Sequence, residues 1–397
     1  MRILLVTGLV AGGVGQHVAM LTRGLTTAGH TVVVACPDTV AAQFGLSDLG
    51  ARHVRLEVGA RPHPRRDRAA VVCLRELLSA CDVVHAHGLR AGALAALARA
   101  AGTTPRLVVT SHNGPPALAS RGTSGPSVSG ALAARLLYGQ LERLVCRRAD
   151  LLLAVSPDLL QRARAKGADA TALAIVPAPP ARVRDRSIAR AVLAAELGLA
   201  GSDLVVLSIG RLAPQKQMGA LISAMVRVGA EQAGSDGRPV LLIAGEGPDR
   251  AALQRRLDLP ETADALDARL LGHREDVPAL LAAVDVVVSA AQWEGQPVWL
   301  QEALAKGAPI VATDVGGTRQ VVGEAALLVP PIRGEDGEKV LAEAIAQVLG
   351  DPTLRSDLRG QALLRAAQLP TEADAITAAV TAYRSGVAGD QPTAAVT

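Results

Sequence analysis

Short, uninterrupted apolar runs recur along the first half of the chain and alternate with longer segments of helical periodicity. Apolar runs that lack polar alternation are typical of strands buried on both faces of a parallel sheet. The predicted strands span residues 2–7, 31–36, 53–57, 82–86, 107–111, 150–155 and 172–176, and the predicted helices lie near 14–29, 66–80, 90–101, 128–148 and 157–167. This alternation predicts an α/β fold with helices on both faces of the sheet.

The same alternation starts again after a segment rich in proline and arginine, residues 177–190. Its predicted strands lie near residues 203–209, 239–244, 268–271, 284–289, 309–312 and 325–329. We therefore expect two Rossmann-like domains, residues 1–176 and 191–370, facing each other across a cleft and joined by a linker at 177–190. Residues 371–397 are predicted to form a C-terminal helix, which would pack back on the first domain, and a frayed tail.

Composition narrows the class of protein. Hydrophobic residues make up 49% of the 397 residues, which is ample for two cores. Aromatic residues make up 1%, so recognition of nucleic acid by stacking is not expected. The net charge is only +4, and the one dense basic run, residues 61–68, is interpreted as a solvated loop, with contact to phosphate or a membrane as the alternative.

The cysteines and the apolar runs bear on location. Cys36, Cys73, Cys81 and Cys146 show neither disulfide nor metal spacing, which indicates reduced thiols in a cytoplasmic protein. The chain opens on a predicted strand without the apolar segment of a secretory signal. No run of about 18 apolar residues predicts a membrane span. Peripheral contact with the inner face of a membrane is compatible with these features.

Two acidic residues flank a predicted helix start in the second half. Glu294 lies in the loop after strand 284–289, and Glu302 lies in the second turn of the helix that Pro297 begins. Residues 315–318 (Val-Gly-Gly-Thr) are expected to open the next helix with free backbone N–H groups, which suits an anion. Loops at the carboxyl ends of parallel strands form ligand sites, so the pattern predicts a site for vicinal hydroxyls and a diphosphate. Ordinary surface acids near a helix start are the alternative.

A second basic pattern follows predicted strand 203–209. Gly210 permits close approach of a ligand to the backbone, and Arg211 and Lys216 supply a bidentate and a point positive charge. Taken alone, an arginine and a lysine at this spacing are usually solvated.

The first glycine-rich loop contains Gly12, Gly13 and Gly15 between a strand and a helix. A dinucleotide fingerprint would need a small residue at position 18, where Val18 stands, so binding of NAD or FAD is disfavoured. The alternative is that Gly12 and Gly13 border the cleft and touch a phosphate or the acceptor.

Three histidines lie at predicted strand ends. His85 and His87 are two apart on one strand and point the same way, but no third metal ligand is evident nearby. A structural or cleft-lining role is favoured over a metal site. His112 follows strand 107–111, at a strand end where a ligand crevice is expected.

Glu294 and Glu302 form a Glu-x7-Glu pattern inside a longer motif, Glu-Gly-Gln-Pro…Glu-Ala-Leu-Ala-Lys-Gly-Ala-Pro-Ile-Val-Ala-Thr-Asp-Val-Gly-Gly. This motif resembles the signature of the fourth family of retaining glycosyltransferases, which have the GT-B fold. The resemblance extends to Gly210-Arg211…Lys216 and to nearly the whole chain. It departs at Gln296, at Gln320, and at Trp299 and Gln301, which precede Glu302.

The resemblance implies a role for each candidate residue. Glu294, His112, Arg211 and Lys216 would serve catalysis, with Glu294 and His112 holding the hexose and the two cations stabilising the leaving diphosphate. Glu302 would hold the ribose. The donor would also contact residues of the glycine-rich loops: Gly12, Gly13, Gly210, Gly245, Gly272, Gly295, Gly316, Gly317 and Thr318.

The implied activity is hexosyl transfer, with retention, from a UDP- or GDP-sugar to an acceptor hydroxyl in glycan, glycolipid or glycoside biosynthesis. No cofactor is expected, and no Asp-x-Asp occurs that would support a metal-bridged phosphate. The acceptor, whether a glycan, a lipid-linked or a small molecule, is not identified by any motif. A related UDP-sugar 2-epimerase and a non-catalytic sugar-nucleotide-binding protein stay open as alternatives, and a dinucleotide oxidoreductase is weaker.

Overall fold

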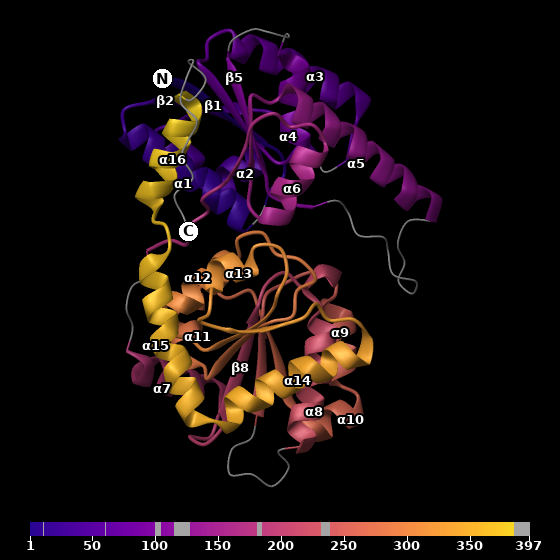
Figure 1. The fold of residues 1–397 in the computed structure, drawn as a ribbon, viewed down its shortest axis with the longest axis vertical. Helices are drawn as coiled ribbons and strands as arrows, with labels where there is room; N and C mark the ends of the chain where they lie inside the picture. Colours follow the sequence, from indigo (N-terminus) through magenta and orange to yellow (C-terminus); the bar gives the residue numbers. More distant parts are fainter. Residues whose placement is uncertain are drawn as a thin grey trace. The chain divides into compact units, whose positions relative to one another are not determined.

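The computed structural model describes residues 1–10, 12–59, 61–99, 105–114, 128–180, 185–231 and 239–384, with the side chains of 128–133 left aside (Figure 1). Residues 181–184 of the expected linker and 385–397 of the expected tail lie outside this description. The chain divides into two compact units: unit 1 is residues 1–177 together with 370–397, and unit 2 is residues 178–369.

Unit 1 is built on a parallel sheet with the strand order β3-β2-β1-β4-β5-β6-β7. Its strands are β1 (Arg2–Thr7), β2 (Thr31–Cys36), β3 (Arg52–Arg55), β4 (Val83–His87), β5 (Arg106–Ser111), β6 (Leu151–Ala154) and β7 (Thr171–Leu173). Its helices are α1 (Gly13–Thr27), α2 (Asp38–Gln43), η1 (Leu46–Leu49), α3 (Pro64–Leu78), α4 (Leu89–Ala98), α5 (Val128–Arg148), α6 (Pro157–Ala165) and α16 (Glu372–Arg384). The central strands β1 and β4 are buried almost throughout, as expected for strands covered on both faces, although β4 carries His85 and His87.

Unit 2 repeats the architecture with the strand order β10-β9-β8-β11-β12-β13. Its strands are β8 (Leu204–Ile209), β9 (Pro239–Ala244), β10 (Asp267–Gly272), β11 (Val286–Ser289), β12 (Ile310–Thr313) and β13 (Leu327–Val329). Its helices are α7 (Arg186–Leu197), η2 (Pro214–Lys216), α8 (Met218–Glu231), α9 (Arg250–Leu257), α10 (Pro260–Ala265), α11 (Val277–Ala283), α12 (Val298–Ala305), α13 (Thr318–Val322), α14 (Gly334–Gly350) and α15 (Pro352–Gln368). One core cluster joins the sheet to α8, α9 and α14, and a second joins its other face to α7, α11, α12, α13 and α15.

The predicted α/β class with two Rossmann-like sheets is confirmed. The predicted boundaries of β1, β2 and β9 agree with the structure, and those of the other strands differ from it by one or more residues. The largest difference is at β7, a short strand at the edge of its sheet, where fewer buried positions fix the ends of the strand.

The basic run at residues 61–68 corrects an expectation. It is not a loop throughout, because α3 begins at Pro64. The His63 ring accepts a hydrogen bond from Arg66 N, and Asp67 accepts one from His63 N, at 3.0 Å. This reciprocal cap satisfies the N–H groups of His63 and Arg66, so Arg65, Arg66 and Arg68 stand on a helix.

The C-terminal helix α16 belongs to unit 1, far in sequence from the rest of that unit. It packs against α1, where Gly24 leaves room for the side chain of Ile376. Arg23 and Glu372 form an ion pair at 2.9 Å between the same two helices. Buried Tyr383 reaches His85 on β4, with 2.7 Å between Oη and Nδ1.

Candidate functional site

An ion pair stands at the carboxyl ends of two neighbouring strands of unit 2. Because β8 and β11 pair in parallel, the loops that follow them meet at one edge of the sheet. The loop after β8 carries Lys216 in η2, and the loop after β11 carries Glu294. Lys216 Nζ donates a hydrogen bond to Glu294 Oε1, and the two side chains are only 15% and 9% exposed. Sequence analysis selected both residues without foreseeing that they pair.

The Gly-Gly turn after β12 packs directly under Glu294. Gly316 has φ 56°, and a Cβ there would overlap the carbonyl oxygen of Glu294. Gly317 N donates to that same oxygen at 3.0 Å, and Thr318 N donates to Val315 O at 3.0 Å. The expected free N–H groups are therefore wrong for Gly317 and Thr318. The turn instead fixes the backbone that carries Glu294.

Glu302 stands on α12, which begins at Val298 with Pro297 as its N-cap rather than as its first residue. It is half-buried, and burial raises the pKa of its carboxyl group, opposed by the charge of Lys306. Its neighbour Gln301 is buried, and Gln301 Oε1 accepts a hydrogen bond from Ala178 N at 3.0 Å. The unusual glutamine at 301 thus ties the start of unit 2 to α12.

Arg211 lies in the loop that follows β8. Its side chain is exposed and forms no ion pair with a described residue. Gly210 before it has φ 154°, which favours glycine, and a Cβ there would lie 3.4 Å from Lys216 Cε. Among described non-glycine residues, Gln217 alone has a positive φ, 48°, so the loop that carries Arg211 and Lys216 ends in a left-handed residue.

Other glycines of the predicted donor site serve close packing between strand-end loops. Gly245 has φ 142°, and a Cβ there would overlap the carbonyl oxygen of Gly210. Gly272, with φ 70°, ends β10, and its amide partner in the sheet is Gly245, whose N donates to Gly272 O at 2.8 Å. Gly295 follows Glu294 in the β11 loop. These loops at 210, 245 and 272 form one row along the edge of the sheet.

Unit 1 brings together four buried histidines: His17 on α1, His85 and His87 on β4, and His112 just after β5. His87 Nδ1 lies 3.1 Å from His112 Nε2, so one ring donates an N–H to the other. The ring of His17 lies 5.6 Å, centroid to centroid, from the rings of both. His85 bonds Tyr383 through Nδ1 and Thr110 through Nε2, each at 2.7 Å.

Burial keeps these imidazoles neutral. Removal from water lowers the pKa of His17 to about 4 and that of His85 to about 3, and it also lowers the pKa of His87 and His112 well below the usual value. His17 Nδ1 and His87 Nε2 are buried without a hydrogen-bond partner among the described residues. In the described part of the chain, no three His, Cys, Asp or Glu side chains are placed to hold a metal ion.

Gly12 and Gly13 form the start of α1 in the same unit. Gly12 is the N-cap with φ 55°, and a Cβ there would meet nothing within 4 Å. Its conformation, rather than crowding, therefore favours glycine at this position. The open space next to Gly12 is compatible with a ligand.

Two residues of the histidine cluster, His17 and its neighbour Tyr383, were not predicted from the sequence. His17 lies in line with Leu21 and Leu25 on the buried face of α1, so a polar residue on an apolar helical stripe was the available signal. Tyr383 gave no comparable signal, because its contact with His85 joins residues 298 positions apart.

Comparisons with known proteins agree with this architecture. The family described as "Glycosyl transferase 4-like domain" matches residues 12–179, and the family "Glycosyl transferases group 1" matches residues 203–351. The two matches fall one on each unit. The chain therefore belongs to the glycosyltransferases that consist of two Rossmann-like domains, the GT-B class.

Among curated relatives, the D-inositol 3-phosphate glycosyltransferase of Nocardia farcinica (strain IFM 10152) is 30% identical over 289 residues, which is 70% of this chain and 60% of the relative. The alpha-D-kanosaminyltransferase of Streptomyces kanamyceticus is 27% identical over 177 residues, 44% of this chain and 43% of the relative. The matches thus span about 60% and 43% of the lengths of these two relatives.

Solved structures share the fold over nearly the whole chain. Sucrose-phosphate synthase from Thermosynechococcus elongatus has a TM-score of 0.75 at 20% identity, covering 96% of this chain and 98% of that one. Anabaena HepE in complex with UDP-glucose has a TM-score of 0.71 at 19% identity, covering 96% and 99%. Within the described residues, no helix has both the length and the apolar character needed to cross a bilayer.

Proposed function

We propose that the protein transfers a hexosyl unit from a nucleoside diphosphate sugar, a UDP- or GDP-sugar, to an acceptor hydroxyl with retention of anomeric configuration. The observation that carries the proposal is the buried Lys216–Glu294 pair at the carboxyl ends of β8 and β11. A lysine and a carboxylate held there, beside the exposed Arg211, offer both charges that a sugar diphosphate needs: cations for phosphate and an acceptor for hydroxyls.

Donor binding changes the partner of Lys216. A diphosphate competes with Glu294 for the Lys216 ammonium, and Arg211 adds a second cation from the same loop. Glu294, released from the lysine, then accepts hydrogen bonds from hexose hydroxyls. Glu302, on α12, accepts hydrogen bonds from the hydroxyls of the ribose. These assignments require no metal and no cofactor, because the side chains themselves carry the positive charge.

The remaining glycines shape the donor site. Gly210, Gly245 and Gly272 let the strand-end loops pack closely, and Gly295 sits beside Glu294. In place of anion binding by free amides, we assign Gly316, Gly317 and Thr318 the task of holding the Glu294 backbone. In unit 1, His112 is assigned to the hexose, and Gly12 and Gly13 to a phosphate or the acceptor.

The transfer step balances without an external reagent. The bond between the anomeric carbon and the β-phosphate oxygen breaks, and a bond from that carbon to the acceptor oxygen forms on the same face. The acceptor proton passes to the departing phosphate oxygen, so the leaving group acts as the base. Arg211 and Lys216 stabilise the negative charge that develops on the diphosphate.

The acceptor is proposed only by class. Of the two relatives named above, one is named for glycosyl transfer to an inositol phosphate and the other for transfer of a kanosaminyl group. A further relative, from Escherichia coli, is a galactosyltransferase for a diphosphoundecaprenol-linked sugar. A small polyol, a glycan or a lipid-linked sugar is therefore the range to search. We place the enzyme in the cytoplasm, where activated sugar nucleotides are available to it.

The first experiment is thermal stabilisation of the full chain by UDP, GDP, ADP, NAD and nucleotide sugars, without added metal. A ligand at 100 times its Kd stabilises by about 2.7 kcal/mol, which raises the melting temperature measurably. A shift with one nucleoside diphosphate names the donor. A shift with NAD alone, or with no nucleotide, contradicts the proposal.

The matched variants are Arg211→Ala and Arg255→Ala, which remove exposed arginines from the β8 loop and from α9. Arg211→Ala should abolish the nucleotide shift and lower kcat/KM by about a hundredfold or more, the effect of losing one charge-stabilising group. Arg255→Ala should leave both unchanged. Nucleotide release that occurs without any acceptor would instead indicate an epimerase, and anomeric analysis of the product by NMR tests retention.

A further inference from the structure

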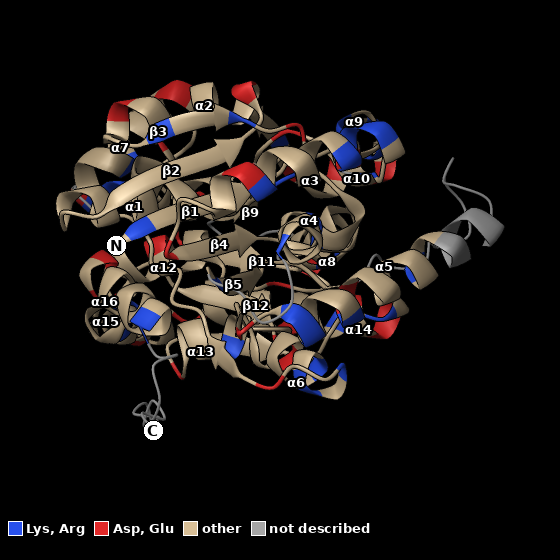
Figure 2. Ribbon diagram, turned by 90° about the horizontal axis from the view of Figure 1, so that it is seen from above, with Lys and Arg blue, Asp and Glu red and all other residues tan. Residues whose placement is uncertain are grey.

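Unit 1 carries a positive face that the transfer reaction does not use. Helices α3 and α5 flank α4, and the three pack side by side on the sheet (Figure 2). Together they contain nine arginines, no lysine and three carboxylates, a net charge of +6 against +4 for the whole chain. The rest of the protein is therefore slightly negative, and its positive charge is concentrated on these helices.

Most of this charge is available to a partner. Eight of the nine arginines are exposed: Arg65, Arg66, Arg68, Arg75, Arg135, Arg143, Arg147 and Arg148. Of the carboxylates, Asp67 is held by Arg90 at 2.6 Å and Glu142 by Arg162, and neither arginine belongs to the exposed set. Glu76 is left as the exposed acid among them.

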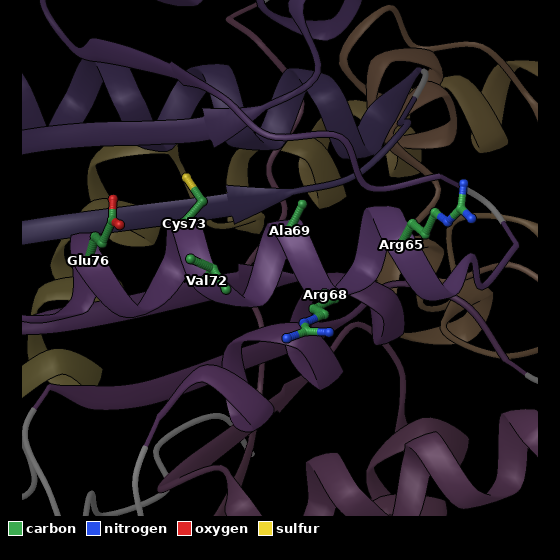
Figure 3. A pocket seen from close by; sticks show the side chains of 6 residues that line it. All are labelled: Arg65, Arg68, Ala69, Val72, Cys73 and Glu76. Atoms are coloured by element: carbon green, nitrogen blue, oxygen red, sulfur yellow. The ribbon is translucent and has the colours of Figure 1, made fainter.

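Exposed apolar side chains lie among the arginines. On α5, Leu136 is 63% exposed and Leu137 is 44% exposed. Helical spacing places Leu136 in line with Arg143 and Arg147, on the side opposite buried Val145. On α3, exposed Val72 lines an open groove of about 470 Å³ together with Arg65 and Arg68 (Figure 3). Leucine and valine exposed between arginines are typical of a surface that lies in a membrane interface.

We propose that the outer face of α3 and α5 docks on a bilayer that contains anionic phospholipid. The arginines bind lipid phosphates, and Leu136 and Leu137 enter the boundary between headgroups and acyl chains. Charge complementarity and the exposed leucines together favour lipid. Leucines gain nothing from a nucleic acid, and the aromatic residue of these two helices, Tyr138, is half-buried and donates a hydrogen bond to Asn113 O instead of offering its ring to a base. The inference concerns unit 1 alone and does not depend on the proposed transferase reaction.

The test is co-sedimentation of the full chain with vesicles of phosphatidylcholine alone or mixed with phosphatidylglycerol. Binding should occur to the anionic vesicles, weaken as salt screens the arginines, and be absent from the neutral ones. Each arginine near an anionic surface contributes about fivefold in affinity, so Arg65→Glu/Arg68→Glu should weaken binding by more than about 25-fold.

The matched control is Arg227→Glu/Arg255→Glu, which makes the same change of net charge at two exposed arginines of unit 2. It should bind anionic vesicles within about twofold of the unmodified protein, since these two arginines do not belong to the proposed contact face. Leu136→Ser/Leu137→Ser should remove the part of the binding that persists at high salt. Unchanged melting temperatures show that each variant is folded.

Three outcomes overturn the proposal. The first is no binding to anionic vesicles, and the second is an equal loss of binding in the two double-arginine variants. The third is binding of the protein to RNA without binding to any vesicle. Because the assay measures no turnover, its failure leaves the proposed transferase activity untouched, and loss of the nucleotide-induced thermal shift leaves the membrane proposal untouched.

Discussion

Single residues decide how the donor site of unit 2 is held ready. Lys216 and Glu294 neutralise each other in a nearly dry setting, and Gly316 allows the turn beneath them to approach the Glu294 carbonyl. A buried charge that loses its partner is costly, whereas the intact pair satisfies both groups. The structure therefore stores the two groups as a pair, ready to exchange partners when phosphate and hydroxyls arrive.

Lys216→Met should lower the free energy of unfolding by about 3 kcal/mol, because it leaves the Glu294 carboxylate buried and unpaired. The double variant Lys216→Met/Glu294→Gln should recover more than half of that loss, since no unpaired charge is left. Urea unfolding of the single and double variants measures both values. Additive losses in the double variant would show that the two side chains do not stabilise each other.

At this scale the sequence indicated which residues to select but not what they contact. Arg211, Lys216, Glu294 and Glu302 were chosen for charge and position after strands. Their pairing depends on which strands become neighbours. Strand β8 lies between β9, the next strand in the sequence, and β11, which comes much later. The amides of Gly317 and Thr318 failed as an anion site for the same reason, because a distant carbonyl takes one of them.

Elements meet most closely at the histidine cluster of unit 1. Helix α1, strands β4 and β5 and helix α16 each contribute a side chain to one connected set of rings and hydroxyls. The hydrogen bond between the neutral imidazoles of His87 and His112 fixes the orientation of these two rings, since the N–H must face an acceptor. The cluster therefore positions His112, the proposed hexose contact, through His87.

Stability should fall as the pH drops below about 6.5, where histidines of the unfolded chain begin to bind protons that the folded cluster refuses. The pKa of His17 is lowered to about 4, so this residue alone lowers the free energy of unfolding by about 3 kcal/mol as the pH falls from 6.5 to 4. The contribution is fully present above pH 6.5. Melting temperatures measured from pH 7.5 to 5 give the slope.

His17→Gln should reduce that slope by about a quarter, because one of the four cluster histidines no longer titrates. His273→Gln is the matched control, since His273 is exposed and its surroundings change little on unfolding. A slope that the two variants alter equally would argue against burial as the cause.

The whole molecule consists of two similar sheets with separate tasks. Unit 2 carries the proposed donor site, and unit 1 carries the histidine cluster and the arginine-rich face. The α/β class and nearly every central strand could be predicted from apolar periodicity, because buried parallel strands have a clear pattern. The start of α3 was predicted too late in the chain, because the cap formed by His63 and Asp67 lies in a basic run that was interpreted as a loop.

Hydrogen exchange with and without the nucleotide that stabilises the protein should separate the tasks. Amides of residues 210–217 and 293–296 should gain protection, because the ligand fixes the loops after β8 and β11. Amides of α5 should exchange at the same rate in both samples. Protection confined to unit 1 would move the proposed nucleotide site out of unit 2.

The return of α16 to unit 1 has a consequence for synthesis on the ribosome. Unit 2 is continuous in sequence and can be completed as soon as residue 369 has emerged, whereas unit 1 waits for the last stretch of the chain. Until Tyr383 arrives, His85 Nδ1 lacks its hydrogen-bond partner and the α1 surface around Gly24 stays bare. The first half to be translated is thus the last to reach its native state, and a nascent chain halted before residue 370 carries a unit 1 that lacks α16.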